Sequence, residues 1–265
     1  MTRQELESKL ASGIRDFRGA DLRGMKLNGA MLDGADLRGA DLREVDLKGA
    51  NLEWADLDGA NLKGADLRGA DLWGANLKDA NLKVADLTEA HIGGANLTGA
   101  DLTRAYLGGA VLEDANLTGA ILRGVNMTIA NLMGVDLTGA DLEGADLEWA
   151  KLDGAKLKGA QGLVALAPVP ETGSFIAWKK LKNGAVAKLR IPDDAARTGS
   201  YVGTKCRAER VEVLEGDGTS IYDPSVTYSP GRILEVQDFN PDPRVECAPG
   251  LHFFMTEQEA QNYIF

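Results

Sequence analysis

Three side chains near the end of the sequence carry groups that could do chemistry. Cys206 and Cys247 supply thiols, and His252 follows Cys247 by five positions. Thiolate and imidazole are both zinc ligands, and a thiol beside an imidazole can act as a nucleophile. However, the chain has no Cys-x-x-Cys pair, and a fourth ligand would have to come from an unidentified carboxylate. We therefore expect no catalytic residue, no cofactor and no metal, and keep a Cys/His metal or catalytic site as an alternative.

The segment 174–265 must position these three residues, and its apolar pattern predicts a small α+β domain. Two apolar segments, 175–181 and 185–191, flank Asn183-Gly184, which is the strongest short signal for a hairpin. Further strands are predicted at 205–215, 232–236 and 251–255. A capping box of Thr256 and Glu259 then predicts a short helix that ends near Tyr263.

A five-residue repeat occupies more than half of the chain. From Phe17 to Leu157 every fifth residue is apolar, a small residue stands two positions before most of them, and the unit is Ala-(Asp/Asn)-Leu-x-Gly. A helix would spread these apolar residues around its circumference, and a straight strand would send them to alternate faces. The chain must therefore turn once in every repeat.

The repeat resembles the pentapeptide-repeat family, whose Ala-(Asp/Asn)-Leu-x-x units wind into a right-handed quadrilateral β-helix. This resemblance implies a mainly β protein with four repeats per coil and about seven coils between Phe17 and Leu157. The segment that ends in Cys-Ala-Pro-Gly-Leu-His-Phe-Phe resembles an uncharacterised module appended to some bacterial and phage members, and this second resemblance implies no activity.

Four regions follow from these patterns. Thr2 and Glu5 form a predicted capping box that opens a cap helix within residues 1–14, which would cover the open end of the β-helix. The β-helix is predicted over 15–160, a linker with two prolines over 161–173, and the α+β domain over 174–265.

Side chains twenty residues apart should stack into columns along such a coil, so its surface can be derived from the sequence. One column is rich in arginine and lysine and runs beside a column of aspartate and asparagine, with which it should pair. Another face is apolar, and we call it the tryptophan face; its members are Met31, Trp54, Trp73, His91, Val111 and Met133. Exposed aromatic residues indicate a contact surface, although the cap helix or the C-terminal domain could equally cover this face.

Charge limits the class of partner. The whole chain carries 29 basic and 40 acidic side chains, a net charge of −11, which disfavours direct binding of nucleic acid. The family includes quinolone-resistance and gyrase-inhibiting members that resemble B-form DNA. Residues 15–160 carry a net charge of −8, however, whereas duplex DNA of the same length of roughly 35 Å would carry about 20 charges. A DNA-mimicking binder or inhibitor of DNA gyrase is therefore an alternative to our main expectation.

The main expectation is a non-catalytic scaffold that mediates protein–protein interaction with an unidentified protein partner. The first residues contain no apolar stretch of signal-peptide length, and no segment approaches the roughly 20 apolar residues that span a bilayer. We therefore expect a cytoplasmic protein without a membrane partner.

Overall fold

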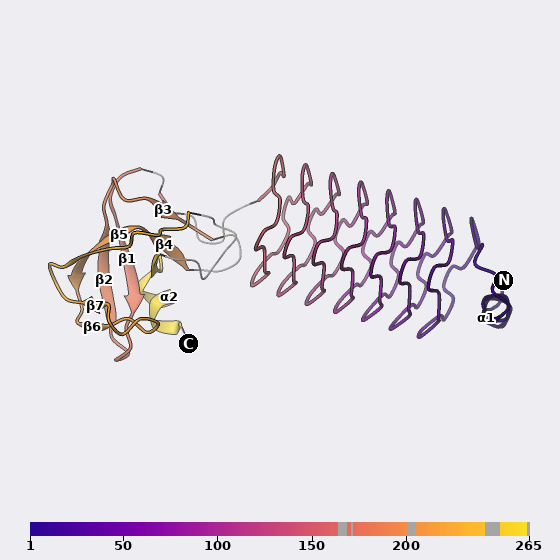
Figure 1. Cartoon of the computed structure of the whole chain (residues 1–265), viewed down its shortest axis with the longest axis horizontal. Coiled ribbons are helices and arrows are strands. Elements are labelled where there is room, and N and C mark those ends of the chain that lie inside the picture. Colours follow the sequence, from indigo (N-terminus) through magenta and orange to yellow (C-terminus); the bar gives the residue numbers. More distant parts are fainter. Residues whose placement is uncertain (164–168, 171, 201–204, 242–249, 264–265) are drawn as a thin grey trace. The chain divides into compact units, whose positions relative to one another are not determined.

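A computed structural model describes residues 1–163, 169–170, 172–200, 205–241 and 250–263. The chain divides into two compact units, Met1–Leu163 and Val164–Phe265, which are described separately below (Figure 1). Within the predicted linker, residues 164–168 and 171 lie outside the described residues.

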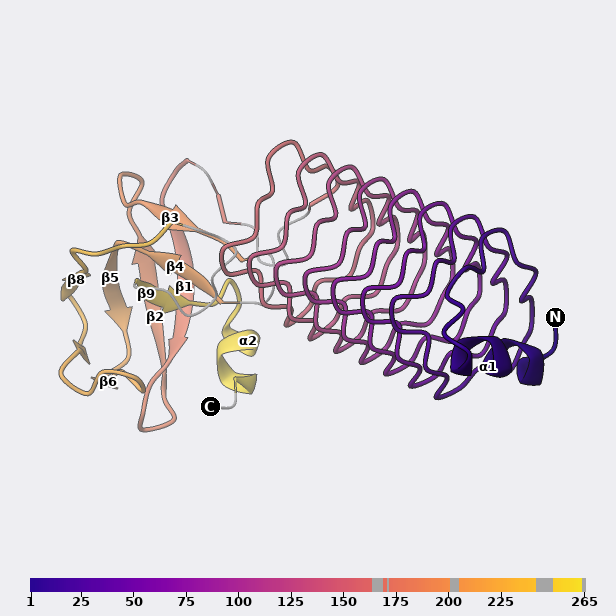
Figure 2. The same ribbon diagram turned by 45° about the vertical axis from the view of Figure 1, so that its right-hand side comes forward.

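The first unit is a right-handed quadrilateral β-helix, as the repeat predicts. Parallel β-bridges join residues twenty positions apart, from Asp16–Asp36 to Asp141–Gln161, so each coil contains four repeats (Figure 2). The N–H of Leu22 donates to the carbonyl of Asp41 at 2.9 Å, and the N–H of Asp41 donates back to the carbonyl of Ala20 at 2.9 Å. This ladder recurs in successive coils, and its inward leucines are fully buried until the last coil, where Leu157 is half-buried.

A tight turn follows each inward residue and gives the coil its square outline. The N–H of Ala30 donates to the carbonyl of Leu27 at 2.9 Å, and Gly29, the third residue of that turn, has a φ of +66°. Glycine suits this left-handed position because it has no Cβ. Some turns place another residue there at a positive φ, namely Glu44, Trp54, Asp79, Val84, Glu89, Arg104, Asp114, Ile129 and Trp149.

Helix α1 (Arg3–Ala11) lies at the N-terminal end of the coils (Figure 1). The hydroxyl of Thr2 accepts from the N–H of Glu5, and the Glu5 carboxylate accepts from the N–H of Thr2, which completes the capping box. Leu6 is fully buried, and the Arg3 guanidinium donates to the carbonyl of Lys26 at 3.0 Å. The helix therefore packs on the first coils and covers their open end.

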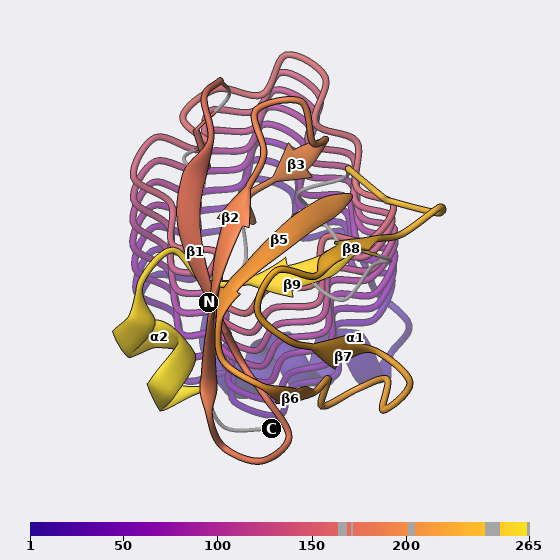
Figure 3. The same cartoon turned by 90° about the vertical axis from the view of Figure 1, so that its left-hand side faces the viewer.

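The second unit is an α+β domain. The described elements of this unit are β1 (Phe175–Lys180), β2 (Val186–Ile191), β3 (Arg197–Thr198), β4 (Cys206–Ala208), β5 (Arg210–Glu215), β6 (Gly218–Thr219), β7 (Thr227–Tyr228), β8 (Ile233–Glu235), β9 (Leu251–Phe253) and α2 (Glu257–Asn262). The larger antiparallel sheet has the order β1-β2-β5-β8 (Figure 3). A smaller sheet has the order β3-β4-β9, and β6 pairs with β7. Both sheets enclose one apolar core that includes Leu189, Val213 and Phe253.

The hairpin of β1 and β2 turns at Asn183-Gly184, as predicted, with Phe175 opposite Ile191. Of these two residues only Gly184 has a positive φ, whereas a two-residue type I′ turn would give both of them a positive φ. The single strand predicted over 205–215 is wrong, because the chain passes from one sheet to the other at Glu209. There the N–H of Glu209 donates to the carbonyl of Ala196, and its carbonyl accepts from the N–H of Val236.

The fold class, a β-helix followed by a small α+β domain, is confirmed. Among the described residues, no helix is both long and apolar enough to cross a lipid bilayer.

Candidate functional site

The tryptophan face contains a pair of indole rings in contact on adjacent coils. The backbone ladder brings them together, because the N–H of Trp54 donates to the carbonyl of Trp73 at 3.0 Å. The ring centroids are 4.6 Å apart and the ring planes meet at 84°, which is an edge-to-face contact. Trp54 is nevertheless 60% exposed and Trp73 is 49% exposed. The pair therefore presents a large aromatic surface on a rigid backbone.

Two glycines make room for these rings. A Cβ atom on Gly74 would lie 2.6 Å from two carbons of the Trp54 ring, and a Cβ atom on Gly93 would lie 3.2 Å from Cδ1 of Trp73. Carbon atoms do not approach to 2.6 Å without displacement of one of them, so any other residue at Gly74 must move Trp54. The position of the indole pair is thus set by the glycines of the following coil.

Beside Trp73 the surface is hollowed, and we call this feature the acidic hollow. It has a volume of about 490 Å³ and is lined by Glu53, Asp71, Trp73, His91, Gly93, Gly94, Val111, Glu113 and Asp114. The ring of Trp73 and the side chain of Val111 supply apolar surface, while four carboxylates surround it. No lysine or arginine occurs among the described lining residues. An aromatic ring close to several carboxylates is suited to a cationic group.

The structure brings most of the predicted face together. His91 pairs with Asp71 on one side and with Val111 on the other in the parallel ladder, and both line the hollow with Trp73. Met31 and Met133 are 61% and 37% exposed, and neither lines the hollow. The face predicted from the sequence did not include the four carboxylates, although the same twenty-residue columns place Glu53, Trp73 and Glu113 in one row.

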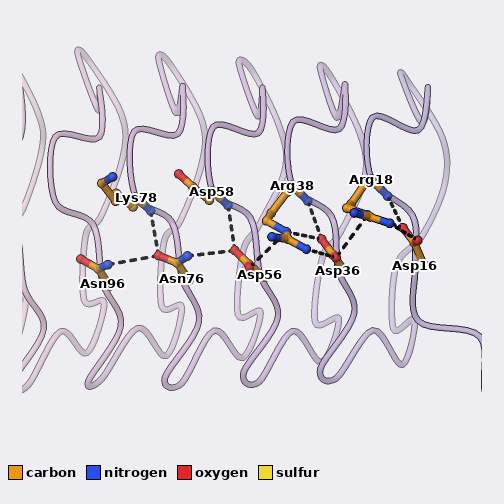
Figure 4. Close-up of polar contacts among 9 residues, drawn as sticks. All are labelled: Asp16, Arg18, Asp36, Arg38, Asp56, Asp58, Asn76, Lys78 and Asn96. Carbon is orange, nitrogen blue, oxygen red and sulfur yellow. Dashed lines mark hydrogen bonds and ion pairs between the residues drawn. The ribbon is translucent and has the colours of Figure 1, made fainter.

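Several arginines of the coil form ion pairs with aspartates, and Figure 4 shows two of them, Arg18 and Arg38. Each of Arg18 and Arg38 donates to the aspartate two residues before it and reaches the aspartate of the next coil; for Arg38 these contacts are 2.8 Å to Asp36 and 3.4 Å to Asp56. Hydrogen bonds from Arg18 lower the pKa of Asp16 to about 2, and those from Arg23 do the same for Asp21. These paired arginines therefore do not form a free positive surface.

The Cys and His candidates do not converge as a ligand set. In the pairing of β4 with β9, Cys206 lies opposite Phe253 and Arg207 lies opposite His252. Neighbouring residues of a strand point to opposite faces of a sheet, so the Cys206 thiol and the His252 imidazole lie on different faces. Cys206 is fully buried in the apolar core, and burial raises the pKa of its thiol to about 12. Such a thiol is a poor nucleophile at neutral pH.

Cys247 lies outside the described residues. Within the described part of the chain, no group of three or more His, Cys, Asp or Glu side chains could hold a metal ion.

Comparison with known proteins assigns the two units to different sequence families. The family described as pentapeptide repeats (8 copies) matches residues 16–53, 46–83, 65–104, 95–128 and 130–161. Residues 166–260 match a family of unknown function, DUF5758. No curated protein matches the chain.

Solved structures of pentapeptide repeat proteins are similar to the chain. QnrB1, a plasmid-mediated fluoroquinolone resistance protein, is 22% identical with a TM-score of 0.52, and the match covers 56% of this chain and 77% of QnrB1. A protein of the Arabidopsis thaliana thylakoid lumen is 34% identical, with 41% and 69% coverage and a TM-score of 0.29. HetL of Nostoc sp. strain PCC 7120, involved in heterocyst differentiation regulation, is 34% identical, with 60% and 94% coverage and a TM-score of 0.21. The likeness to QnrB1 reflects a shared fold.

Proposed function

Since the chain belongs to the pentapeptide-repeat family, we propose that it is a non-catalytic scaffold that binds a protein partner through the tryptophan face. The observation that carries this proposal is the exposed edge-to-face pair of Trp54 and Trp73. Tryptophan is enriched among the residues that dominate binding energy at protein interfaces. A rigid backbone also holds the two rings in place before a partner arrives, which reduces the entropy lost on binding.

The acidic hollow supports a partner that carries positive charge. Its four carboxylates and the ring of Trp73 favour a basic segment, with an arginine or lysine side chain inserted above Gly93 and Gly94. Because the arginines of the neighbouring columns are already paired with aspartates, they do not compete strongly for these carboxylates. Partner binding should therefore weaken as the salt concentration rises.

Affinity capture from a lysate of the source cells tests the proposal. The intact chain should retain a protein that the double variant Trp54→Ala, Trp73→Ala does not retain. Trp149→Ala is the matched control, because Trp149 is also 49% exposed but lies on another face of the coil. Loss of the partner with Trp149→Ala and retention by the double variant would contradict the proposal.

A gyrase-binding DNA mimic is a second candidate function. The fold likeness to QnrB1 and the net charge of −8 over residues 15–160 favour it. The ion pairs between arginine and aspartate weigh against it, because they place positive charge along faces that a mimic of DNA would keep negative. A DNA supercoiling assay with the added chain distinguishes these two candidates. A gyrase binder should inhibit or protect gyrase, whereas a scaffold that does not bind gyrase should leave supercoiling unchanged.

The Cys/His metal or catalytic site remains the third candidate and has less support. The opposite orientations of Cys206 and His252 disfavour a shared metal ion. Metal analysis of the purified chain tests this alternative, because a stoichiometric zinc content that disappears in Cys206→Ser would favour it.

A further inference from the structure

The C-terminal unit contains a second hollow, which we call the lysine hollow. It has a volume of about 430 Å³ and is formed by residues of β1, β7 and β9 and of the segments between the strands. Its walls include the apolar side chains of Val226, Val236 and Leu251. The acidic residue Asp223 also lines it, and its carboxylate accepts hydrogen bonds from the N–H and the hydroxyl of Ser225. A concave site with apolar walls and a few polar groups is typical of a binding site for a small molecule.

Lys179 is the most unusual residue of this hollow. It occupies an inward position of β1, two residues after the buried Ala177, and is 7% exposed. Its ammonium group donates to the carbonyl of His252 at 3.1 Å and lies 5.6 Å from the centre of the Tyr228 ring. Among the described residues, no carboxylate forms an ion pair with Lys179. An ammonium group has three N–H donors, and the two contacts above do not balance its positive charge. An anion in the hollow would accept a hydrogen bond from this group and balance the charge.

A second ammonium group lies close by. Lys205 is also 7% exposed and lines the same hollow, with its Nζ 4.7 Å from the centre of the Tyr263 ring and 5.5 Å from that of Tyr222. Burial, and secondarily the positive charge of Lys205, lower the pKa of Lys179 to about 8. The two lysines are therefore close enough for their charges to repel each other.

We propose that the lysine hollow binds a small organic anion, with its carboxylate or phosphate group near Lys179 and Lys205 and its apolar part against Val226, Val236 and Leu251. The charge of such an anion is complementary to the buried ammonium group of Lys179, which forms no ion pair with a described carboxylate. Attraction is strongest where water is excluded, and both lysines are almost completely buried. The hydroxyl group of Ser220, which also lines the hollow and accepts from the N–H of Asp223, can donate to the same anion.

Pyridoxal 5′-phosphate is a suitable probe because it carries both an anionic phosphate and an aldehyde. The neutral amine of a lysine adds to the aldehyde and releases water to form an imine, and borohydride then supplies the hydride that reduces the imine to a stable secondary amine. The full-length chain is treated at pH 8, and peptide mass spectrometry measures the labelling at each lysine. About half of Lys179 is neutral at this pH, so it should react at least about tenfold faster than Lys188, which is half-buried and ion-paired with Glu215.

Competitors and variants complete the test. Hexanoate at millimolar concentration should protect Lys179 if the natural anion is a carboxylate, and inorganic phosphate should protect it if the anion is a phosphate; either result supports the proposal. Lys205→Met should slow the labelling of Lys179, whereas Lys188→Met should leave it unchanged. Labelling of Lys179 that is no faster than that of Lys188, or that neither competitor reduces, would overturn the proposal, and this result needs no variant to fold.

Discussion

Replacement of Gly74 by alanine should displace the ring of Trp54 and so disturb the indole pair. The same replacement at Gly69, which occupies an equivalent turn, should displace no neighbour. Gly74 and Gly69 have almost the same backbone conformation, with φ values of +63° and +60°. A Cβ atom on Gly74 would lie 2.6 Å from the Trp54 ring, whereas a Cβ atom on Gly69 would have no neighbour within 4 Å. Each alanine should lower the free energy of unfolding by about 1–2 kcal/mol because of its left-handed conformation.

Gly74→Ala should lower the free energy of unfolding further, because the displaced Trp54 ring loses its edge-to-face contact with Trp73. Such a contact contributes about 0.5–1.5 kcal/mol, so we expect Gly74→Ala to be less stable than Gly69→Ala by about 1 kcal/mol. Urea denaturation followed by circular dichroism measures this difference.

The same two substitutions in a Trp54→Ala background provide the control. Without the indole, both alanines should destabilise the chain equally, since only their backbone conformations remain. Equal stabilities of Gly74→Ala and Gly69→Ala in the intact chain would contradict the predicted contact between Gly74 and Trp54, as would a larger effect at Gly74 that persists without Trp54.

Three further predictions concern the core, the turns and the buried lysine. Leu87→Ala, at a fully buried position in the middle of the coils, should lower the free energy of unfolding by about 2–5 kcal/mol in urea denaturation. Val84→Gly should raise it by about 1 kcal/mol in the same assay, because Val84 has a φ of +52° and a branched side chain that is strained there. Lys179→Met should raise it at pH 7 by up to about 3 kcal/mol, because the folded state no longer holds a charged lysine in the interior. That gain should shrink as the pH rises from about 8 to above 10.5, because over this range the folded wild-type chain has already lost the Lys179 proton while the unfolded chain still holds it; thermal unfolding at several pH values would measure the gain, and a constant gain would contradict the burial argument.

Much of the fold could be predicted from the sequence because one constraint repeats many times. An apolar residue at every fifth position, followed by glycine in most repeats, is compatible only with a chain that turns after each repeat. The family resemblance then supplied the length of the coil, and the twenty-residue columns placed Trp54 and Trp73 on one face. The structure adds that both side chains are exposed.

The details of the two hollows could not be predicted because they depend on contacts between distant residues. The contact of Trp54 with Gly74 depends on a rotamer, which the repeat does not encode. Whether Cys206 and His252 share a face depends on the register of β4 and β9, and a shift by one residue would reverse the answer. Lys179 gave a weak signal, since a lysine two residues after Ala177 interrupts the inward apolar positions of a predicted strand.

The affinity of the captured partner for the tryptophan variants tests most directly whether this face is the binding surface. The intact chain and Trp149→Ala should bind the partner equally tightly. The double variant Trp54→Ala, Trp73→Ala should bind at least about tenfold more weakly, because residues that dominate an interface contribute about 2 kcal/mol or more each. A double variant that folds normally and binds as tightly as the intact chain would contradict the assignment of the tryptophan face.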